Sequence, residues 1–383
     1  MSIGRRNGRI DLIRGISIAL VLLHHFNIAY RLPASPLGTL FGPELVRAVC
    51  RNGNYGVTMF FTVSGFLITG NALRRWGELD RVRPLPFYGL RVARILPCLL
   101  LLLVPVTLLG LAGVPMFANR AEAGPPVSFL RANLAALSFT MNLLMQRAGW
   151  FSYCLCVLWS LSVEEVFYVC FPLICAGLRR PRRIVAVWIA CILLGPTWRF
   201  FHQSDEAGFL YATPACLDGI AIGCLAALAA TRSGVMQWLR SPTGRAAQAA
   251  TVLLMAAFYL WRSIGVTNVP GVTLMALGTA MLMLGTPPDG GARGRAGAPM
   301  RWLGRHSYEL YLFHLVALAF MRMVLPPAML APALKLPWLA TFLLVSILLA
   351  DAVARFWAEP WNRGIRRWLS IRSDRTASPV GAA

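Results

Sequence analysis

Several short segments of the sequence carry residue types that can hold an anion or move a proton, and the first lies near the N-terminus. In RIDLIRGISIALVLLHHF, Arg14 and His25 are eleven residues apart. At 100° per residue they share one face of a helix, about 16 Å apart along its axis. The guanidinium could hold an anionic donor while the imidazole serves as a base toward a hydroxyl. Alternatively, Arg14 is a topological anchor and His25 a hydrogen-bonded histidine of the helix core.

Two adjacent carboxylates stand midway through the apolar segment LWSLSVEEVFYVCFPLI. Ser160, Glu164 and Tyr168 follow i, i+4 spacing and share a face, whereas Glu165 points about 100° away. A charged side chain near the bilayer centre costs about 2.5 to 3.5 kcal/mol on insertion scales. We therefore expect a functional role for this pair, although an interhelical hydrogen-bonding network is an alternative for one of them.

Arg91 and Arg94 lie one turn apart in RPLPFYGLRVARILP, at the start of a predicted helix. Two guanidiniums at i, i+3 suit bidentate contacts to phosphate. They equally suit lipid headgroups and membrane topology, and spacing alone favours the topological role.

The segment GRHSYELYLFHL places Ser307 and His314 on one face, with Tyr311 one turn before the histidine. His314 could be a second catalytic group, but a structural or substrate-positioning role is favoured. The other ionisable residues inside apolar segments are His24, Asp218 and Asp351.

The composition shows what must position these residues. The chain of 383 residues is 57% hydrophobic and 14% charged, with a mean hydropathy of +0.61. Soluble proteins carry about a quarter charged residues, so an all-α integral membrane protein is predicted. About ten runs are long enough to cross a bilayer, over residues 10–30, 55–73, 92–114, 154–178, 184–201, 210–230, 247–264, 270–286, 306–325 and 337–357. Residues 128–145 are predicted as a loop or interfacial helix.

The arginines predict the orientation of these spans. With a cytoplasmic N-terminus, 27 of the 37 basic residues fall at inside segments, among them Arg5, Arg6, Arg293 and Arg295. The positive-inside rule then places both termini in the cytoplasm, and the net charge of +22 reflects topology, with no nucleic-acid partner expected. The first span lacks a cleavage site and is expected to be retained. We expect a transmembrane domain over 1–360, a basic cytoplasmic tail over 361–383, and no appended soluble catalytic domain.

Taken together, five segments resemble membrane acyltransferase family 3, the polytopic O-acyltransferases that include O-antigen, exopolysaccharide and nodulation-factor acetylases. The resemblance covers most of the chain and keeps the order of the elements. They are the Arg-ten residues-His element Arg14 to His25, FFTVSGFLI from Phe60, the RxxR element at Arg91 and Arg94, WSLSVEEVFYVCFP from Trp159, and SYELYLFH from Ser307 to His314.

The resemblance implies transfer of an acyl group, most often acetyl, from acyl-CoA to a hydroxyl of a carbohydrate-bearing acceptor, such as an exopolysaccharide or lipopolysaccharide, at a bacterial inner membrane. It implies a general base or acyl relay at His25, and donor binding by Arg14, Arg91 and Arg94. Glu164 and Glu165 would support the site. We place Ser160, Asp218, Tyr311 and His314 among the substrate-binding residues. No metal and no permanently bound cofactor are expected, membrane lipids are the surrounding partners, and the oligomeric state stays open.

One departure from the family concerns the sixth span. Family members often carry an arginine two positions before its aspartate, where ACLDGIAIG has Cys216 before Asp218. Arg199, at the outer end of the preceding span, is the candidate substitute. The acceptor-binding role of Asp218 is accordingly in doubt.

Two other functions remain open at this point. A proton-coupled secondary transporter would also use membrane-embedded acids and histidines, although no paired half-repeats with broken helices are found. A non-catalytic membrane scaffold would tolerate replacement of Arg14, His25 and Glu164.

Overall fold

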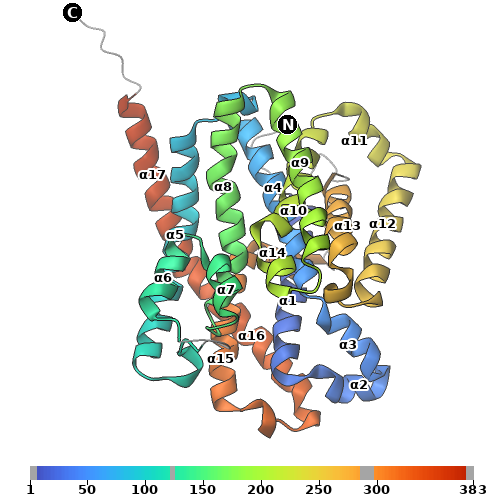
Figure 1. The fold of residues 1–383 in the computed structure, drawn as a ribbon, viewed down its shortest axis with the longest axis vertical. Coiled ribbons are helices and arrows are strands. Elements are labelled where there is room, and N and C mark those ends of the chain that lie inside the picture. The colour runs from blue at the N-terminus through green and yellow to red at the C-terminus, as the bar shows by residue number, and fades with distance from the viewer. Residues whose placement is uncertain (1–6, 121–125, 285–296, 377–383) are drawn as a thin grey trace, which may run out of the picture.

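The chain folds as an all-helical bundle, seen in a computed structural model (Figure 1). The structure describes residues 7–120, 126–284 and 297–376, the last eight of these by their backbone only. Within these ranges there are helices and turns and one isolated bridge between Asn119 and Ser152. Nine helices of the described chain are long and apolar enough to cross a membrane. The predicted fold class, an all-α multi-pass membrane protein, is confirmed.

The long helices run the length of the bundle (Figure 1). They are Gly8–Tyr30 (α1), Asn54–Trp76 (α4), Pro84–Leu111 (α5), Trp159–Leu178 (α8), Pro181–Phe201 (α9), Thr213–Ala229 (α10), Pro242–Trp261 (α12), Ile264–Leu284 (α13), Ser307–Val324 (α15) and Lys335–Val353 (α16). Shorter helices are Pro36–Phe41 (α2), Pro43–Arg51 (α3), Phe129–Leu137 (α6), Met141–Ala148 (α7), Ser233–Arg240 (α11) and Ala298–Arg305 (α14), and the C-terminal helix is Glu359–Thr376 (α17). Proline begins several of them, because its missing N–H costs nothing in a first turn.

Each predicted span corresponds to one long helix, but α12 is not among the nine candidate spans. Arg245 and Gln248 in its first turns lower its mean hydropathy. Its 20 residues nevertheless extend about 30 Å. The segment 128–145 forms α6 and α7, of nine and eight residues, which are too short to cross a bilayer.

Some predictions fall on residues outside the described ranges. They are the end of the span 270–286, the basic residues Arg5, Arg6, Arg293 and Arg295, and positions 377–383 of the predicted tail.

Both described ends of the chain lie at the same end of the bundle. In Figure 1 the beginning of α1 and the far end of α17 are at the top, while α2 and α3 are at the bottom. This arrangement requires an even number of crossings, and α12 is the candidate for a tenth beside the nine candidate spans of the described chain. We refer below to the top as the α17 end and to the bottom as the α2–α3 end.

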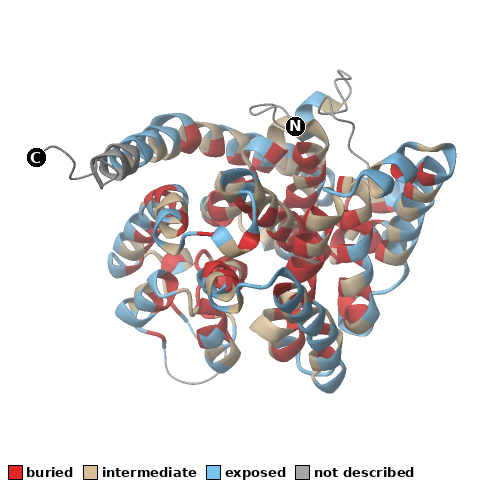
Figure 2. Cartoon of the chain, turned by 90° about the horizontal axis from the view of Figure 1, so that it is seen from above, coloured by how far each residue is buried: buried red, intermediate tan, exposed pale blue. Residues whose placement is uncertain are grey.

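Apolar side chains cover the outside of the bundle as well as its core. Viewed from above, buried residues gather where the helices face one another and exposed residues line the periphery (Figure 2). Leu108, Leu253 and Leu344 are 60%, 71% and 57% exposed. An exposed apolar surface of this extent is suited to lipid.

Glycines bring α4 and α10 into backbone contact. A Cβ on Gly65 would lie 2.0 Å from the carbonyl oxygen of Ile220, and one on Gly223 would lie 2.0 Å from that of Thr62. Small residues at such crossings let membrane helices approach closely. The packing fixes the position of α4, whose side chains form one wall of the cavity described below.

The predicted tail is largely a helix. The backbone continues from α16 through a π-helical turn, Ala354–Ala358, into α17, which packs against α5. The indole N–H of Trp357 donates to the carbonyl oxygen of Pro97 at 2.9 Å. This bond ties the turn before α17 to the helix that carries Arg91 and Arg94.

Candidate active site

A cavity of about 120 Å³ lies between α1, α4, α5, α8 and α15. Its apolar lining comes mainly from α4, including Val57, Phe60 and Leu67. Of the ten predicted site residues, all of them in the described ranges, seven line this cavity: Arg14, Arg91, Arg94, Ser160, Glu164, Glu165 and Tyr311. Residues from four sequence segments thus meet in one place.

Aromatic rings hold the two arginines of the RxxR element. The guanidinium of Arg91 lies 4.2 Å from the ring centre of Tyr168 and 5.8 Å from that of Phe87. Arg94 lies 6.0 Å from the ring centre of Tyr308. Cation–π contacts at these distances are attractive and orient the guanidinium plane. Neither arginine forms an ion pair with a carboxylate in the described chain, so their charges remain available to an anion.

The two carboxylates both border the cavity but differ in their contacts. Glu164 Oε2 accepts a hydrogen bond from the hydroxyl of Tyr168 at 3.1 Å. That hydroxyl also contacts the hydroxyl of Ser64 on α4. Glu165 is 5% exposed, and its Oε1 has no hydrogen-bond partner among the described residues. A buried polar atom without a partner is costly, so Glu165 is poised to receive a donor from a bound molecule.

Ser160 and Tyr311 form a hydrogen-bonded pair in the cavity lining. The hydroxyl groups of the two residues lie 2.7 Å apart, and the Tyr311 hydroxyl donates to the carbonyl oxygen of Val157 at 3.1 Å. Both residues line the cavity, and His314 follows Tyr311 by one turn of α15. Tyr311 also connects the cavity lining to the histidines, because its ring centre lies 6.0 Å from that of His314.

His25 and His314 face each other beyond Tyr311. Nδ1 of His25 lies 3.2 Å from Nε2 of His314, and the ring centres are 4.8 Å apart. His314 is fully buried, whereas His25 is partly exposed. Neither belongs to the cavity lining, but His314 is one turn of α15 from Tyr311.

The hydrogen bonds assign a tautomer to each ring. Nδ1 of His314 faces the carbonyl oxygens of Leu310 and Tyr311 at 3.0 and 2.9 Å. A carbonyl oxygen only accepts, so this nitrogen carries the proton and Nε2 is the acceptor in a neutral ring. His25 Nδ1–H then donates to His314 Nε2 and to the carbonyl oxygen of Val21 at 3.0 Å. Nε2 of His25 is consequently the nitrogen with the free lone pair.

The remaining intramembrane ionisable residues lie elsewhere. Nδ1 of His24 bonds the carbonyl oxygen of Cys50 at 2.9 Å, at the junction of α1 and α3. Asp351 pairs with Arg355 at 2.8 Å and approaches His306 at 3.9 Å. Neither residue lines the cavity.

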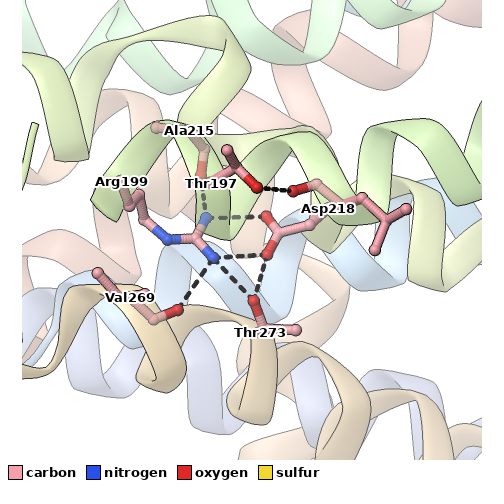
Figure 3. Close-up of polar contacts among 7 residues, drawn as sticks. Thr197, Arg199, Ala215, Asp218, Val269 and Thr273 are labelled. Atoms are coloured by element: carbon pink, nitrogen blue, oxygen red, sulfur yellow. Dashed lines mark hydrogen bonds and ion pairs between the residues drawn. The ribbon is translucent and has the colours of Figure 1, made fainter. Parts of the chain in front are cut away.

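Asp218 is the one predicted site residue that neither lines the cavity nor belongs to the histidine pair. Figure 3 shows its contacts with residues of α9 and α13. Its two carboxylate oxygens accept from Arg199 at 3.0 and 2.7 Å, and one of them accepts from the Thr273 hydroxyl at 2.6 Å. Asp218 and Arg199 are both fully buried. This interaction joins α9, α10 and α13.

Arg199 thus provides from α9 the cation that the sequence lacks at Cys216. It also donates to the backbone carbonyls of Ala215 and Val269. A buried pair is tolerated only when such further hydrogen bonds satisfy the ions. The observed contacts of Asp218 are structural, and its acceptor-binding role stays a prediction.

Ser64, Tyr168 and Ser307 are among the cavity residues that were not predicted as site residues. Tyr168 donates to Glu164, and Ser64 contacts the Tyr168 hydroxyl. Ser307 lines the cavity with a buried hydroxyl that has no partner in the described chain. Tyr168 and Ser307 share a helix face with Glu164 and His314 respectively, which was the available signal. Nothing in FFTVSGFLI distinguishes Ser64 from a packing serine.

Comparison with known proteins extends these observations. Residues 7–355 match the family model described as "Acyltransferase domain". The peptidoglycan O-acetyltransferase OatA of Listeria monocytogenes is 22% identical over 80% of this chain and 48% of its own length. The O-acetyltransferase OatA of Staphylococcus aureus is 25% identical over 70% of this chain and 46% of its own. A putative O-acetyltransferase of S. aureus is 22% identical over 95% and 59%.

The chain spans about half the length of the first two relatives. No solved structure matches it. The family model covers nearly the whole chain and includes the cavity, the two histidines and the Arg199–Asp218 pair. The chain therefore belongs to membrane acyltransferase family 3.

Proposed function

We propose that the protein is a membrane O-acyltransferase that moves an acyl group, acetyl in the first instance, from acyl-CoA to a hydroxyl of a carbohydrate acceptor. The supporting observations are the family, the names of the relatives, and a cationic cavity one helical turn from a histidine pair. The relatives' names specify O-acetylation, and one of them specifies peptidoglycan.

The donor enters from the α17 end. Coenzyme A carries phosphate groups, and arginine binds phosphate with bidentate hydrogen bonds. Arg91 and Arg94 lie 7 and 10 residues into α5, near that end of the bundle. The excess of arginine in the segments at this end supports our placing it on the cytoplasmic side of the membrane, which we take to be a bacterial inner membrane. Arg14, Arg91 and Arg94 would hold the phosphates, with the acyl thioester directed along the cavity toward Ser160 and Tyr311.

His25 serves as the general base. Its Nε2 accepts the proton of the acceptor hydroxyl as that oxygen attacks the thioester carbonyl. A C–O bond forms, the C–S bond breaks, and the coenzyme A thiolate leaves and takes up the proton. General-base help of this kind contributes about 10²- to 10⁴-fold. His314 accepts the Nδ1–H of His25 and so keeps the lone pair on Nε2.

The acceptor approaches from the α2–α3 end. His25 lies eleven residues beyond Arg14 and five before the end of α1 at Tyr30, so it is nearer that end. Separate entry of an anionic donor and a carbohydrate acceptor would allow acylation of a glycan across the membrane. Glu164 and Glu165 support the thioester end of the donor from the cavity wall.

The observation that carries the proposal is the contact between His25 and His314 beyond an arginine-lined cavity. Its test uses purified protein in detergent, acetyl-CoA with a radiolabelled acetyl group, and a panel of peptidoglycan fragments and polysaccharides. We expect free coenzyme A and a labelled, alkali-labile ester on one acceptor class. If neither product formed and the protein carried a solute flux in proteoliposomes, a proton-coupled transporter would be favoured instead.

A further inference from the structure

Two buried polar atoms of the cavity lining have no hydrogen-bond partner in the described chain. They are Oγ of Ser307 on α15 and Oε1 of Glu165 on α8. The two residues are 1% and 5% exposed. The charges of Arg91 and Arg94 attract the Glu165 carboxylate, but no protein group donates a hydrogen bond to its Oε1. An unpaired buried polar atom destabilises a fold, so two of them in one cavity point to a ligand that satisfies both.

The register of the helices places these two atoms at nearly the same level of the cavity. Side-chain contacts along α5 show that α15 runs parallel to it and α8 antiparallel. The hydroxyls of Ser160 and Tyr311 lie 2.7 Å apart and fix the level of α8 against α15. Toward the α17 end, Glu165 lies five residues from Ser160 and Ser307 four residues from Tyr311. These are rises of about 7.5 and 6 Å, so both atoms lie about one turn above the Ser160–Tyr311 pair.

The start of α15 is held against α5 by a neighbour of Ser307. The hydroxyl of Tyr308 donates to the carbonyl oxygen of Ile95 at 3.3 Å, and its ring centre lies 6.0 Å from the guanidinium of Arg94. Tyr308 therefore fixes the position of Ser307 while its own hydroxyl is satisfied. The Ser307 hydroxyl makes no such bond and is free to serve a ligand.

The two atoms select the chemistry of the group between them. A carboxylate oxygen accepts a hydrogen bond and a serine hydroxyl donates one, which is the complement of a secondary amide. Acyl-CoA carries such an amide in its cysteamine unit. Four bonds separate the amide nitrogen from the thioester carbon, roughly 5 Å when extended. One helical turn is about 5.4 Å, so a thioester at the level of Tyr311 brings this amide to the level of Ser307.

We propose that Ser307 and Glu165 bind the cysteamine amide of the acyl-CoA donor. The Ser307 hydroxyl donates to the amide carbonyl oxygen, and the amide N–H donates to Oε1 of Glu165. The inference rests on the proposed function and adds Ser307 to the donor site. A hydroxyl of the glycan acceptor could satisfy the same atoms, but they lie on the α17 side of Tyr311, away from the end at which the acceptor approaches.

The test measures equilibrium binding of acetyl-CoA to the full chain in detergent. The second ligand is an analogue in which –CH2–CH2– replaces the cysteamine amide. The variants are Ser307→Ala and Glu165→Leu, with Ser346→Ala as the control. Ser346, on α16, does not line the cavity, is 2% exposed, and also has a hydroxyl without a partner in the described chain. The control therefore removes an equivalent buried hydroxyl from another part of the bundle.

We expect Ser307→Ala to bind acetyl-CoA about five-fold more weakly, and Glu165→Leu at least about tenfold more weakly, because the second bond involves a charged group. Ser346→Ala should bind as wild type does. The analogue should bind wild type more weakly than acetyl-CoA does, and Ser307→Ala should cause no further loss. Both serine variants should unfold at the wild-type temperature or above, because neither hydroxyl is bonded within the protein.

Several results would overturn the inference. Unchanged acetyl-CoA affinity in Ser307→Ala would do so, as would an equal loss for acetyl-CoA and the analogue. A lower unfolding temperature in Ser307→Ala alone would make the hydroxyl structural, and a loss confined to the glycan acceptor would assign it to the other substrate. If wild type bound neither acetyl-CoA nor the analogue, the proposed function itself would fail and the inference with it.

Discussion

His25 Nδ1 and His314 Nε2 lie 3.2 Å apart although 289 residues separate them in the chain. Each ring also contacts a backbone carbonyl of its own helix, at 3.0 Å for Val21 and for Leu310. These contacts leave one ring nitrogen, Nε2 of His25, as the base of the pair. The relationship gives His314 the role of a positioning residue.

Replacing His314 should show whether its role is to accept the N–H of His25 and so orient that ring. His314→Leu removes the acceptor for the His25 N–H, so we expect kcat to fall at least about tenfold as part of the general-base contribution is lost. His314→Gln retains an acceptor oxygen and should keep more activity. The KM for acyl-CoA should change little in either variant, because His314 lies outside the cavity. If both variants turned over at the wild-type rate, His314 would have only a packing role.

The RxxR element should require arginine and not merely positive charge. Arg91→Lys keeps the charge but loses the bidentate geometry. We expect the KM for acyl-CoA to rise about tenfold, the cost of one charged hydrogen bond. The control is Arg47→Lys at an exposed ion pair with Glu44 on α3, which should leave KM unchanged. A lysine variant with wild-type KM would reduce Arg91 to a topological residue.

The Arg199–Asp218 pair should act mainly on stability. Arg199→Leu leaves a buried carboxylate without its partner, which costs about 3 to 5 kcal/mol. The double variant with Asp218→Leu should recover much of that loss. Unfolding by denaturant in mixed micelles measures both. Asp218→Leu protein that is as stable as wild type but fails to bind acceptor would instead support the substrate-binding role predicted for Asp218.

The α4–α10 crossing should reject any side chain at Gly65. Gly65→Val places its Cβ against the carbonyl oxygen of Ile220, and overpacking of this kind costs about 1 to 3 kcal/mol. Gly70→Val on the same helix meets nothing within 4 Å and is the matched control. We expect a lower unfolding temperature in detergent for the first variant alone. Equal temperatures would mean that the two helices separate without cost.

The sequence was sufficient to predict the membrane spans and several residues that line the cavity. A run of about 20 apolar residues encodes a crossing directly, and Arg14, Glu164 and Tyr311 do line one cavity. Helical periodicity also placed Tyr311 one turn before His314 on one face, and the structure keeps both beside the cavity's end.

Partners across helices could not be predicted in this way. The pairing of His25 with His314, and of Asp218 with Arg199, depends on which helices pack together, and periodicity within one helix does not determine that. The segment after residue 360 was interpreted as a tail because its charge concealed an amphipathic helix, and only the structure shows that this helix packs against α5.

The most direct test of the account replaces His25 itself. Acetyl transfer from labelled acetyl-CoA to a glycan acceptor would be measured for wild type, His25→Ala and the control His202→Gln, whose ring stacks on Trp198 away from the site. We expect His25→Ala to lose at least about 100-fold in kcat, with acetyl-CoA affinity within two-fold of wild type, while His202→Gln stays fully active. A folded His25→Ala protein that acetylates the glycan at the wild-type rate would contradict the account.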